Sequence, residues 1–196
     1  MSKVKEYFNR KAKKYNRDRN KGLLGRQISK EAEAVLEMLN VKKGERILDC
    51  GCGAGYYGLK IKARGGDYLG IDISEEMIKQ ARKNGLRAER CNMKNYESKQ
   101  KYDKVLVSGS LEFCKSPAKA LQSCVKNLKK RGSIVIVIPG LNLIGLLYFL
   151  FHSTHGFRIR LFSLKSIRQL LKKSGVKERE VRKPDSLTYV ISGVKD

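Results

Sequence analysis

The sequence is poor in the residues that build metal centres and disulfide frameworks. It has only two histidines, and its five cysteines are an odd number. Cys50 and Cys52 stand closer together than the C-x-x-C spacing of zinc and redox sites allows. We therefore expect no metal site, and reduced, mostly buried thiols of the kind found in the cytosol.

The first twenty residues lack the apolar core of a secretory signal, so we expect a cytoplasmic protein. No internal repeat, low-complexity tract or Ser/Gly-rich linker divides the chain. Its 196 residues can bury one substantial core but not two full-sized domains. We expect a single domain over residues 1–196.

Acidic residues are also scarce. Nineteen Asp and Glu stand against 43 Lys and Arg, which leaves a net charge of +24. Such a surface attracts polyanions, and nucleic acid, anionic lipid and phosphorylated small molecules are the candidate partners. Lysine-rich helix faces that are simply solvated remain an equal alternative.

The apolar pattern alternates between strand and helix spacing. Residues 3–20 predict a basic amphipathic helix and residues 26–39 a second. Further helices are predicted at about 55–64, 75–84, 117–130 and 163–174, and strands at 46–50, 67–72, 86–91, 102–109 and 133–140. Two alternating runs around Lys183-Pro184-Asp185-Ser186 predict a hairpin. This order predicts an α/β fold: a Rossmann-like, doubly wound, seven-stranded, mostly parallel sheet with a C-terminal antiparallel hairpin strand.

The stretch ILDCGCGAGYYG predicts a ligand-binding turn that fits two registers. Gly51-Cys52-Gly53-Ala54-Gly55 is a G-x-G-x-G turn led by Asp49, whereas the letters from Gly53 to Gly58 match the dinucleotide pattern G-x-G-x-x-G. In both registers glycines let backbone N–H groups approach a ligand, and Asp72 would accept hydrogen bonds from ribose hydroxyls.

Asp49 favours the first register. Beside a pyrophosphate its carboxylate would force two anions together, whereas an ammonium or sulfonium group suits it. S-adenosylmethionine carries both of these cations. Length agrees, because a dinucleotide dehydrogenase usually adds a second nucleotide-binding half and a substrate domain. In this register Gly58 lies inside the following helix.

These segments resemble the class I S-adenosylmethionine-dependent methyltransferases, in particular the small ubiquinone and menaquinone biosynthesis (methyltransferase type 11-like) enzymes, over most of the chain. The glycine stretch resembles their first motif, and LGIDIS their second, with Asp72 as the ribose-binding acid. AERCNMKNY resembles the third, with Asn92 where relatives have an Asp that contacts the adenine amino group. The segment from residue 102 to 140 resembles the fourth and fifth.

The N-terminal segment YFNRKAKKYN resembles the family's A-x-x-Y segment. The resemblance makes Tyr15 a lid residue over the cofactor, and Arg26 the basic residue that meets the methionine carboxylate. Residues 1–40 would form a helical lid. Motifs and resemblance together imply S-adenosylmethionine as cofactor, S-adenosylhomocysteine as product, and a cofactor site of Tyr15, Arg26, Asp49, Gly51, Cys52, Gly53, Gly55, Asp72, Ile73, Met77, Asn92, Met93, Ser108 and Gly109.

Methyl transfer from a sulfonium is an in-line displacement that can proceed without an obligatory catalytic residue. A hydroxyl or phenol acceptor would gain from a base, and Glu112 and His155 are the candidates by position. A surface acid and an ordinary loop histidine are the alternative interpretations.

Residues 141–162 combine an apolar run with the basic segment HGFRIR, and we expect an insertion near the acceptor site. The apolar run from Ile134 to Phe151 reaches the lower length limit for a membrane span, but Pro139 and Gly140 interrupt it. We expect residues 141–151 to wall a lipophilic acceptor pocket. A segment lying on an anionic membrane surface and a homodimer contact are the alternatives.

The predicted function is therefore methyl transfer to a small acceptor, lipophilic if residues 141–151 wall its pocket. An RNA or protein methyltransferase that grips its target through the basic face is one alternative. A non-catalytic module that binds S-adenosylmethionine is the other. The intact glycine turn and Asp72 argue against a lost cofactor site.

Overall fold

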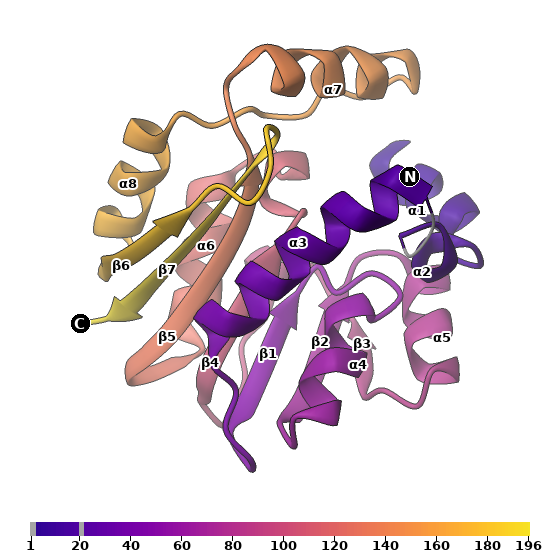
Figure 1. Cartoon of the computed structure of the whole chain (residues 1–196). Coiled ribbons are helices and arrows are strands. Elements are labelled where there is room, and N and C mark those ends of the chain that lie inside the picture. Colours follow the sequence, from indigo (N-terminus) through magenta and orange to yellow (C-terminus); the bar gives the residue numbers. More distant parts are fainter. Residues whose placement is uncertain (1–2, 20–21) are drawn as a thin grey trace.

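A computed structural model describes residues 3–19 and 22–196, which form one seven-stranded sheet with helices on both faces (Figure 1). The strand order is β3-β2-β1-β4-β5-β7-β6. All pairs from β3 to β5 are parallel, and β7 runs antiparallel to both β5 and β6. The strands are β1 (Arg46–Cys50), β2 (Asp67–Asp72), β3 (Ala88–Arg90), β4 (Tyr102–Ser108), β5 (Leu128–Pro139), β6 (Val176–Arg182) and β7 (Thr188–Lys195). The predicted sheet and its hairpin are confirmed.

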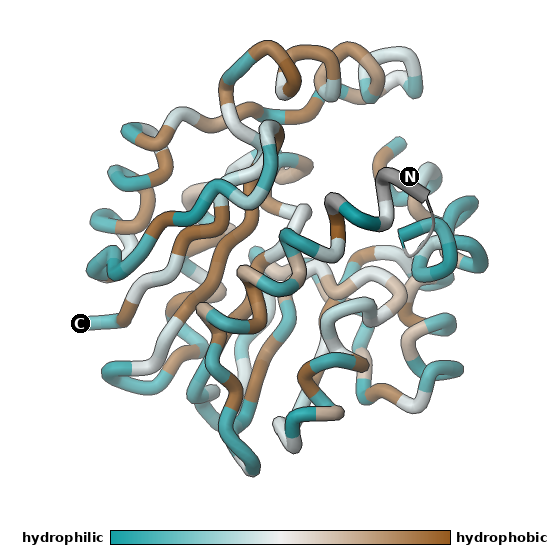
Figure 2. Tube along the Cα trace, in the orientation of Figure 1, coloured by the Kyte–Doolittle hydropathy of each residue, from teal (hydrophilic) through white to brown (hydrophobic). Residues whose placement is uncertain are grey.

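Side chains of successive strand residues point to opposite faces of the sheet, and each face is covered by an apolar layer. On one face α3 (Gly22–Leu39), α4 (Tyr56–Ala63) and α5 (Glu75–Lys83) cover strand residues such as Leu106 and Val135. On the other face, α6 (Pro117–Lys126) and α8 (Leu164–Lys173) cover the adjacent strand residues, such as Val105 and Ile136. Both faces of the central strands are therefore buried, which explains their nearly continuous apolar sequences. Figure 2 shows this hydrophobic composition along β5.

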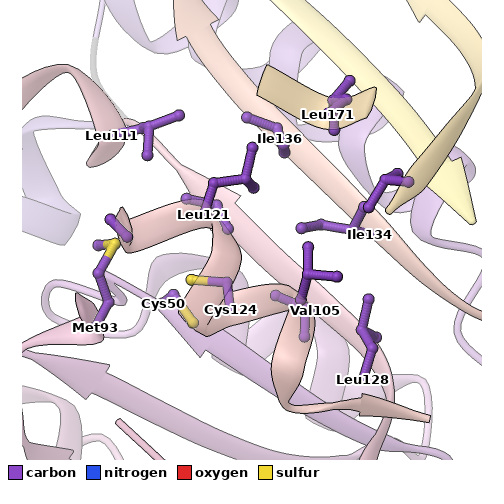
Figure 3. Close-up of a cluster of buried hydrophobic side chains, with 14 of the residues drawn as sticks. Cys50, Met93, Val105, Leu111, Leu121, Cys124, Leu128, Ile134, Ile136 and Leu171 are labelled. Carbon is purple, nitrogen blue, oxygen red and sulfur yellow. The ribbon is translucent and has the colours of Figure 1, made fainter. Parts of the chain in front are cut away.

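The layer beneath α6 supports the end of the sheet where the glycine turn lies. Leu121 and Cys124 of α6 belong to one buried cluster with Cys50, the last residue of β1 (Figure 3). Cys50, Cys52 and Cys124 are buried free thiols, and Cys91 and Cys114 are partly buried free thiols. The two cysteines of the glycine stretch thus pack as small apolar residues.

The predicted N-terminal helix is divided in two, which corrects the sequence expectation for residues 3–20. Within the described residues, α1 (Lys3–Lys11) and α2 (Tyr15–Asp18) are separated by a turn. Ala12 in that turn is buried against Ala54 and Met77, and this contact directs the chain back over the glycine turn. Residues 1–2 and 20–21 of the predicted lid lie outside the described residues.

Boundaries shift elsewhere by a few residues. The helix predicted at 117–130 ends at Lys126, because the buried side chain of Asn127 donates hydrogen bonds to the carbonyl oxygens of Ser123 (2.8 Å) and Tyr96 (3.0 Å). The strand that follows begins at Leu128 instead of residue 133. The strand predicted at 86–91 is shorter, and the turns η1 (Met93–Asn95) and η2 (Leu111–Phe113) follow β3 and β4.

The apolar insertion forms α7 (Leu143–Thr154), which lies beyond the carboxyl end of β5, apart from the sheet (Figure 1). Asn142 caps this helix by accepting a hydrogen bond from the Gly145 N–H at 2.9 Å. In the part of the chain that the structure describes, no helix combines the length and apolar character that crossing a membrane requires.

Candidate functional site

The glycine turn connects β1 to α4 with three left-handed residues. Gly51, Gly53 and Gly55 have φ angles of 83°, 53° and 84°, a conformation that side chains disfavour. A Cβ on Gly51 would also lie 2.3 Å from the Cβ of Ser110, so the backbone passes too close for any side chain. Gly58 lies inside α4, as the G-x-G-x-G register predicts.

Asp72 joins the end of β2 to this turn. Its Oδ2 accepts a hydrogen bond from the Gly53 N–H (2.9 Å) and its Oδ1 one from the Ser74 N–H (2.8 Å). Burial raises the pKa of this carboxyl, and the backbone hydrogen bonds oppose that rise. Asp72 therefore stabilises the conformation of the glycine turn to which a ligand would bind.

A cavity of about 290 Å³ lies where these strand ends meet. Phe8 of α1 and Phe113 of η2 contribute to its wall, and the sequence analysis selected neither. The predicted cofactor residues that line it are Tyr15, Gly51, Gly53, Asp72, Ile73, Met77, Asn92, Met93 and Gly109. The fold thus brings together residues from five segments that are distant in sequence, as the motifs predicted. Their roles as cofactor ligands remain predictions.

The N-terminal helices α1 and α2 lie over the turn, and their role as a lid remains a prediction. A Cβ on Gly53 would lie 3.3 Å from the ring of Tyr15, so this ring covers the turn closely. Asn16 donates a hydrogen bond to the carbonyl oxygen of Ala54 (3.0 Å), and the Ser74 hydroxyl donates one to Asn9 Oδ1 (2.6 Å). The placement of Tyr15 agrees with the lid position that the sequence predicted.

Asp49 is buried beneath the turn and does not line the cavity. The Tyr68 hydroxyl donates to its Oδ2 at 3.0 Å, while Oδ1 has no hydrogen-bond partner. Burial raises the pKa of Asp49 to about 7; the hydrogen bond from Tyr68 and the charge of Arg19 counteract this rise, and Asp72 adds to it. A carboxyl with an unsatisfied oxygen in this position suits a cationic ligand group.

Four other predicted cofactor residues also lie outside the cavity wall. Cys52 packs beneath the turn, where its thiol would meet a Cβ on Gly70 at 2.6 Å. Gly55 makes room for Leu86, and Ser108 is half-buried at the end of β4. Arg26 is exposed, because α3 begins at Gly22 and directs it away from the interior.

Arg19, which follows α2, is partly buried, and it was not among the predicted site residues. Its guanidinium donates to the Tyr15 hydroxyl (3.2 Å) and to Glu31 (3.4 Å), and lies 4.8 Å from the Tyr56 ring centroid. Its Nε is buried without a hydrogen-bond partner. Burial opposes the charged form, but the neighbouring Tyr15 and Glu31 outweigh it and keep the pKa of Arg19 above its usual value.

Glu112 of η2, predicted as a base, is buried beside the cavity. Its Oε2 has no hydrogen-bond partner, and its Oε1 would lie 3.9 Å from a Cβ on the cavity residue Gly109. Burial raises the pKa of Glu112 to about 8. A surface position, the alternative for this residue, is contradicted by its exposed fraction of 3%.

The histidines of α7 occupy different environments. His155, the predicted second base, closes the end of the helix, with Nδ1 2.9 Å from the carbonyl oxygen of Phe151. His152 is instead buried, and its Nδ1 lacks a hydrogen-bond partner. Burial, followed by the charges of His155 and Lys11, lowers the pKa of His152 to about 4, so the ring is neutral at pH 7. Helical spacing puts residues 145, 148 and 152 on one face of α7, but it does not say that this face is the buried one.

His152 is the centre of a group of rings that we call the aromatic cluster: Tyr7, Phe113, Tyr148, His152 and Phe157. The ring centroid of His152 lies 4.5 Å from that of Tyr148, 5.2 Å from Phe157 and 5.5 Å from Phe113. Glu112 directly precedes Phe113 in η2, so it lies beside the cluster, and burial and then the charge of Glu112 raise the pKa of Tyr148. Phe113 belongs to both the cluster and the cavity wall, so the two regions adjoin.

Comparisons with known proteins agree with this geometry. A family model described as a methyltransferase domain matches residues 41–155. The 23S rRNA (uracil(1939)-C(5))-methyltransferase of Neisseria lactamica is 28% identical over 156 residues, which cover 66% of this chain and 34% of that protein. A ubiquinone biosynthesis O-methyltransferase of Aliivibrio fischeri is 29% identical over 108 residues, or 51% of this chain and 46% of that protein. The chain thus spans less than half the length of these curated relatives.

Among solved structures, the magnesium protoporphyrin IX methyltransferase of Synechocystis, crystallised with S-adenosylhomocysteine, superposes with a TM-score of 0.79. The two are 16% identical, and the alignment covers 98% of each chain, so this likeness concerns the fold. The domain match spans more than half of the sequence and includes the glycine turn, Asp72 and Asn92. The chain therefore belongs to the class I S-adenosylmethionine-dependent methyltransferases.

Proposed function

We propose that the protein transfers a methyl group from S-adenosylmethionine to a small lipophilic acceptor, with Glu112 as the base. One observation carries this proposal: Glu112, a buried carboxyl with an unpartnered oxygen, directly precedes Phe113, which lines the cavity and belongs to the aromatic cluster. The aromatic rings would pack against the faces of an apolar acceptor, and the Glu112 carboxyl would orient the hydroxyl group of that acceptor. The similarity to a ubiquinone biosynthesis O-methyltransferase supports an oxygen atom as the methyl acceptor.

The buried charges of the site fit the cofactor. S-adenosylmethionine supplies an electrophilic methyl group together with an ammonium and a carboxylate at its amino-acid end. Asp49 would bind the ammonium through its unpartnered Oδ1, and Arg19, in place of Arg26, would bind the carboxylate through the unpartnered Nε. Asp72 would hold the ribose and Asn92 the adenine, and both line the cavity.

Glu112 would remove the acceptor proton. Its pKa of about 8 lies near physiological pH, which suits a group that must be a carboxylate before transfer and a carboxylic acid afterwards. His152 is neutral and has a buried Nδ1 without a partner, so it would position the acceptor hydroxyl through a hydrogen bond. We propose no catalytic part for His155, whose Nδ1 contacts the end of its own helix.

The test uses a panel of lipophilic phenols as methyl acceptors and measures the S-adenosylhomocysteine formed from S-adenosylmethionine, across a pH range that brackets the Glu112 pKa of about 8. The wild-type rate should rise as the pH passes through this value, because only the carboxylate accepts a proton. Glu112→Gln should lower kcat by about 10²-fold or more and remove this rise. Glu97→Gln, the same change at an exposed glutamate, is the matched control and should behave as wild type.

An RNA acceptor is the second candidate, since the rRNA methyltransferase relative matches 66% of this chain and the net charge is +24. Filter binding to RNA in a salt series distinguishes the two. Tight, sequence-selective binding together with methylated RNA in the same assay would reject the small-molecule proposal. Weak binding that salt abolishes would instead be the non-specific attraction expected of any strongly basic surface.

A further inference from the structure

Helix α7 presents a row of large apolar side chains to solvent. Leu143, Leu147, Leu150 and Phe151 are between 50% and 72% exposed, while Gly145 and His152 on the opposite side are buried. Leu141, just before the helix, is 66% exposed. Monomeric proteins rarely leave such contiguous apolar surface uncovered, so this face has an occupant. Figure 2 shows the hydrophobic character of most of this helix, which stands apart from the sheet.

The length of α7 limits what that occupant can be. Its 12 residues make a helix roughly 18 Å long at 1.5 Å per residue, well short of the roughly 30 Å of a bilayer core. A helix of this length can lie flat in the interface of a bilayer, with one face among the acyl chains. The inner face would meanwhile keep its contacts with the aromatic cluster.

Positive charge borders the apolar face. In the segment after α7, Phe157 and Ile159 are buried, and the alternation leaves Arg158 and Arg160 exposed. The side chain of Lys3 also reaches this region, because a Cβ on Gly156 would lie 3.3 Å from its Nζ. No Asp or Glu occurs in the sequence between Glu112 and Glu178, so α7 and its flanks carry no neutralising acid of their own.

We propose that the exposed face of α7, together with Lys3, Arg158 and Arg160, docks on an anionic phospholipid bilayer. Leucines would enter the acyl region while the cations meet lipid phosphates, the combination typical of interfacial helices. A second copy of the chain fits less well, since a symmetric contact through α7 would bring two sets of like charges together. RNA would leave the leucines uncovered. Docking in this orientation places the aromatic cluster next to the lipid phase.

Flotation of the full chain with vesicles tests the proposal. Vesicles of phosphatidylglycerol and phosphatidylcholine in equal parts should carry the protein upward, and phosphatidylcholine alone should not. Leu147→Glu should weaken binding by at least about tenfold, because the new carboxylate would be placed in the acyl region. Leu59→Glu makes the same change at an exposed leucine of α4 and should leave binding unchanged.

A second pair of variants tests the charge. Arg158→Gln with Arg160→Gln should reduce binding several-fold, whereas Lys130→Gln with Arg131→Gln removes two exposed charges at the opposite end of β5 and should change it little. Equal loss in both pairs would show adsorption by net charge alone and overturn the proposal. So would a dimer in sedimentation velocity that Leu147→Glu converts to monomer while no vesicle is bound.

The vesicle-binding test does not depend on the identity of the methyl acceptor. Calorimetric binding of S-adenosylmethionine, measured on each variant, should be unchanged, because none of these residues lines the cofactor cavity. A protein that binds the cofactor but floats with neither kind of vesicle would refute docking and leave the proposed methyl transfer standing.

Discussion

At the scale of single residues, buried polar atoms without partners gather around the site. They include Arg19 Nε, Asp49 Oδ1, Glu112 Oε2 and His152 Nδ1. Folded proteins pair nearly all such atoms, because an unpaired buried group costs free energy. The four come from the N-terminal segment, β1, η2 and α7. None of them lines the cavity itself, but Arg19 contacts the lining residue Tyr15 and His152 contacts the lining residue Phe113, so the cost lies behind the cavity wall.

Two arginines of the lid give a direct test of the cofactor site. Arg19→Gln should raise the Kd for S-adenosylmethionine by roughly tenfold or more, because the methionine carboxylate would lose its charged hydrogen-bond donor. Arg26→Gln should leave the Kd unchanged, since Arg26 is exposed on α3. Isothermal titration calorimetry measures both, and thermal unfolding checks that each variant is folded. Equal weakening in the two variants would restore Arg26 to the site.

Sequence reasoning could identify Gly51, Gly53 and Asp72, because turn and strand-end positions carry their own local pattern. The resemblance selected Arg26, and no local pattern pointed to Arg19. Both lie in polar helical sequence, and their burial depends on where the lid turns and where α3 begins. The inward position of His152 rather than His155 likewise depends on which face of α7 meets the aromatic cluster.

At the scale of elements, the strands were predicted better than the helix ends. β1 and β2 have the predicted bounds, because an apolar run flanked by charged residues and glycines fixes both limits. The break between α1 and α2 had no such signal, since it results from the burial of Ala12 against distant residues. Tertiary contacts of this kind cannot be read from local periodicity.

Substitution of two glycines can separate the energetic cost of a left-handed backbone from the cost of a steric collision. Gly51 and Gly85 have similar φ angles, 83° and 75°, but a Cβ on Gly85 would meet nothing within 4 Å. Gly85→Ala should therefore lower the free energy of unfolding by about 1 kcal/mol, the cost of the left-handed conformation alone. Gly51→Ala should lower it by about 3 kcal/mol, since its Cβ would also collide with Ser110. Urea unfolding measures both, and equal losses would contradict the close approach at Gly51.

At the scale of the whole molecule, the excess of positive charge should oppose folding. A net charge of +24 repels itself more strongly in the compact state than in the extended chain. Exposed ion pairs such as Arg168–Glu178 offset only part of this, because 19 acids cannot pair 43 bases. The composition alone predicts this repulsion, although it says nothing of where an anionic partner would bind.

Sodium chloride should therefore raise the thermal unfolding midpoint. Between low and physiological ionic strength the Debye length falls to about 8 Å, which screens most repulsion between distant surface charges. We expect an increase in Tm of about 5 °C, measured by differential scanning calorimetry, and no comparable increase with an uncharged solute at equal osmolality.

The repulsion itself can be reduced by substitution. Lys99→Glu with Lys130→Glu, both at exposed positions outside the cavity lining, lowers the net charge by four and should raise Tm in low salt. The same variant should respond less to sodium chloride, because less repulsion remains to be screened. If Tm instead fell in low salt and the salt response were unchanged, the excess charge would not be what limits stability.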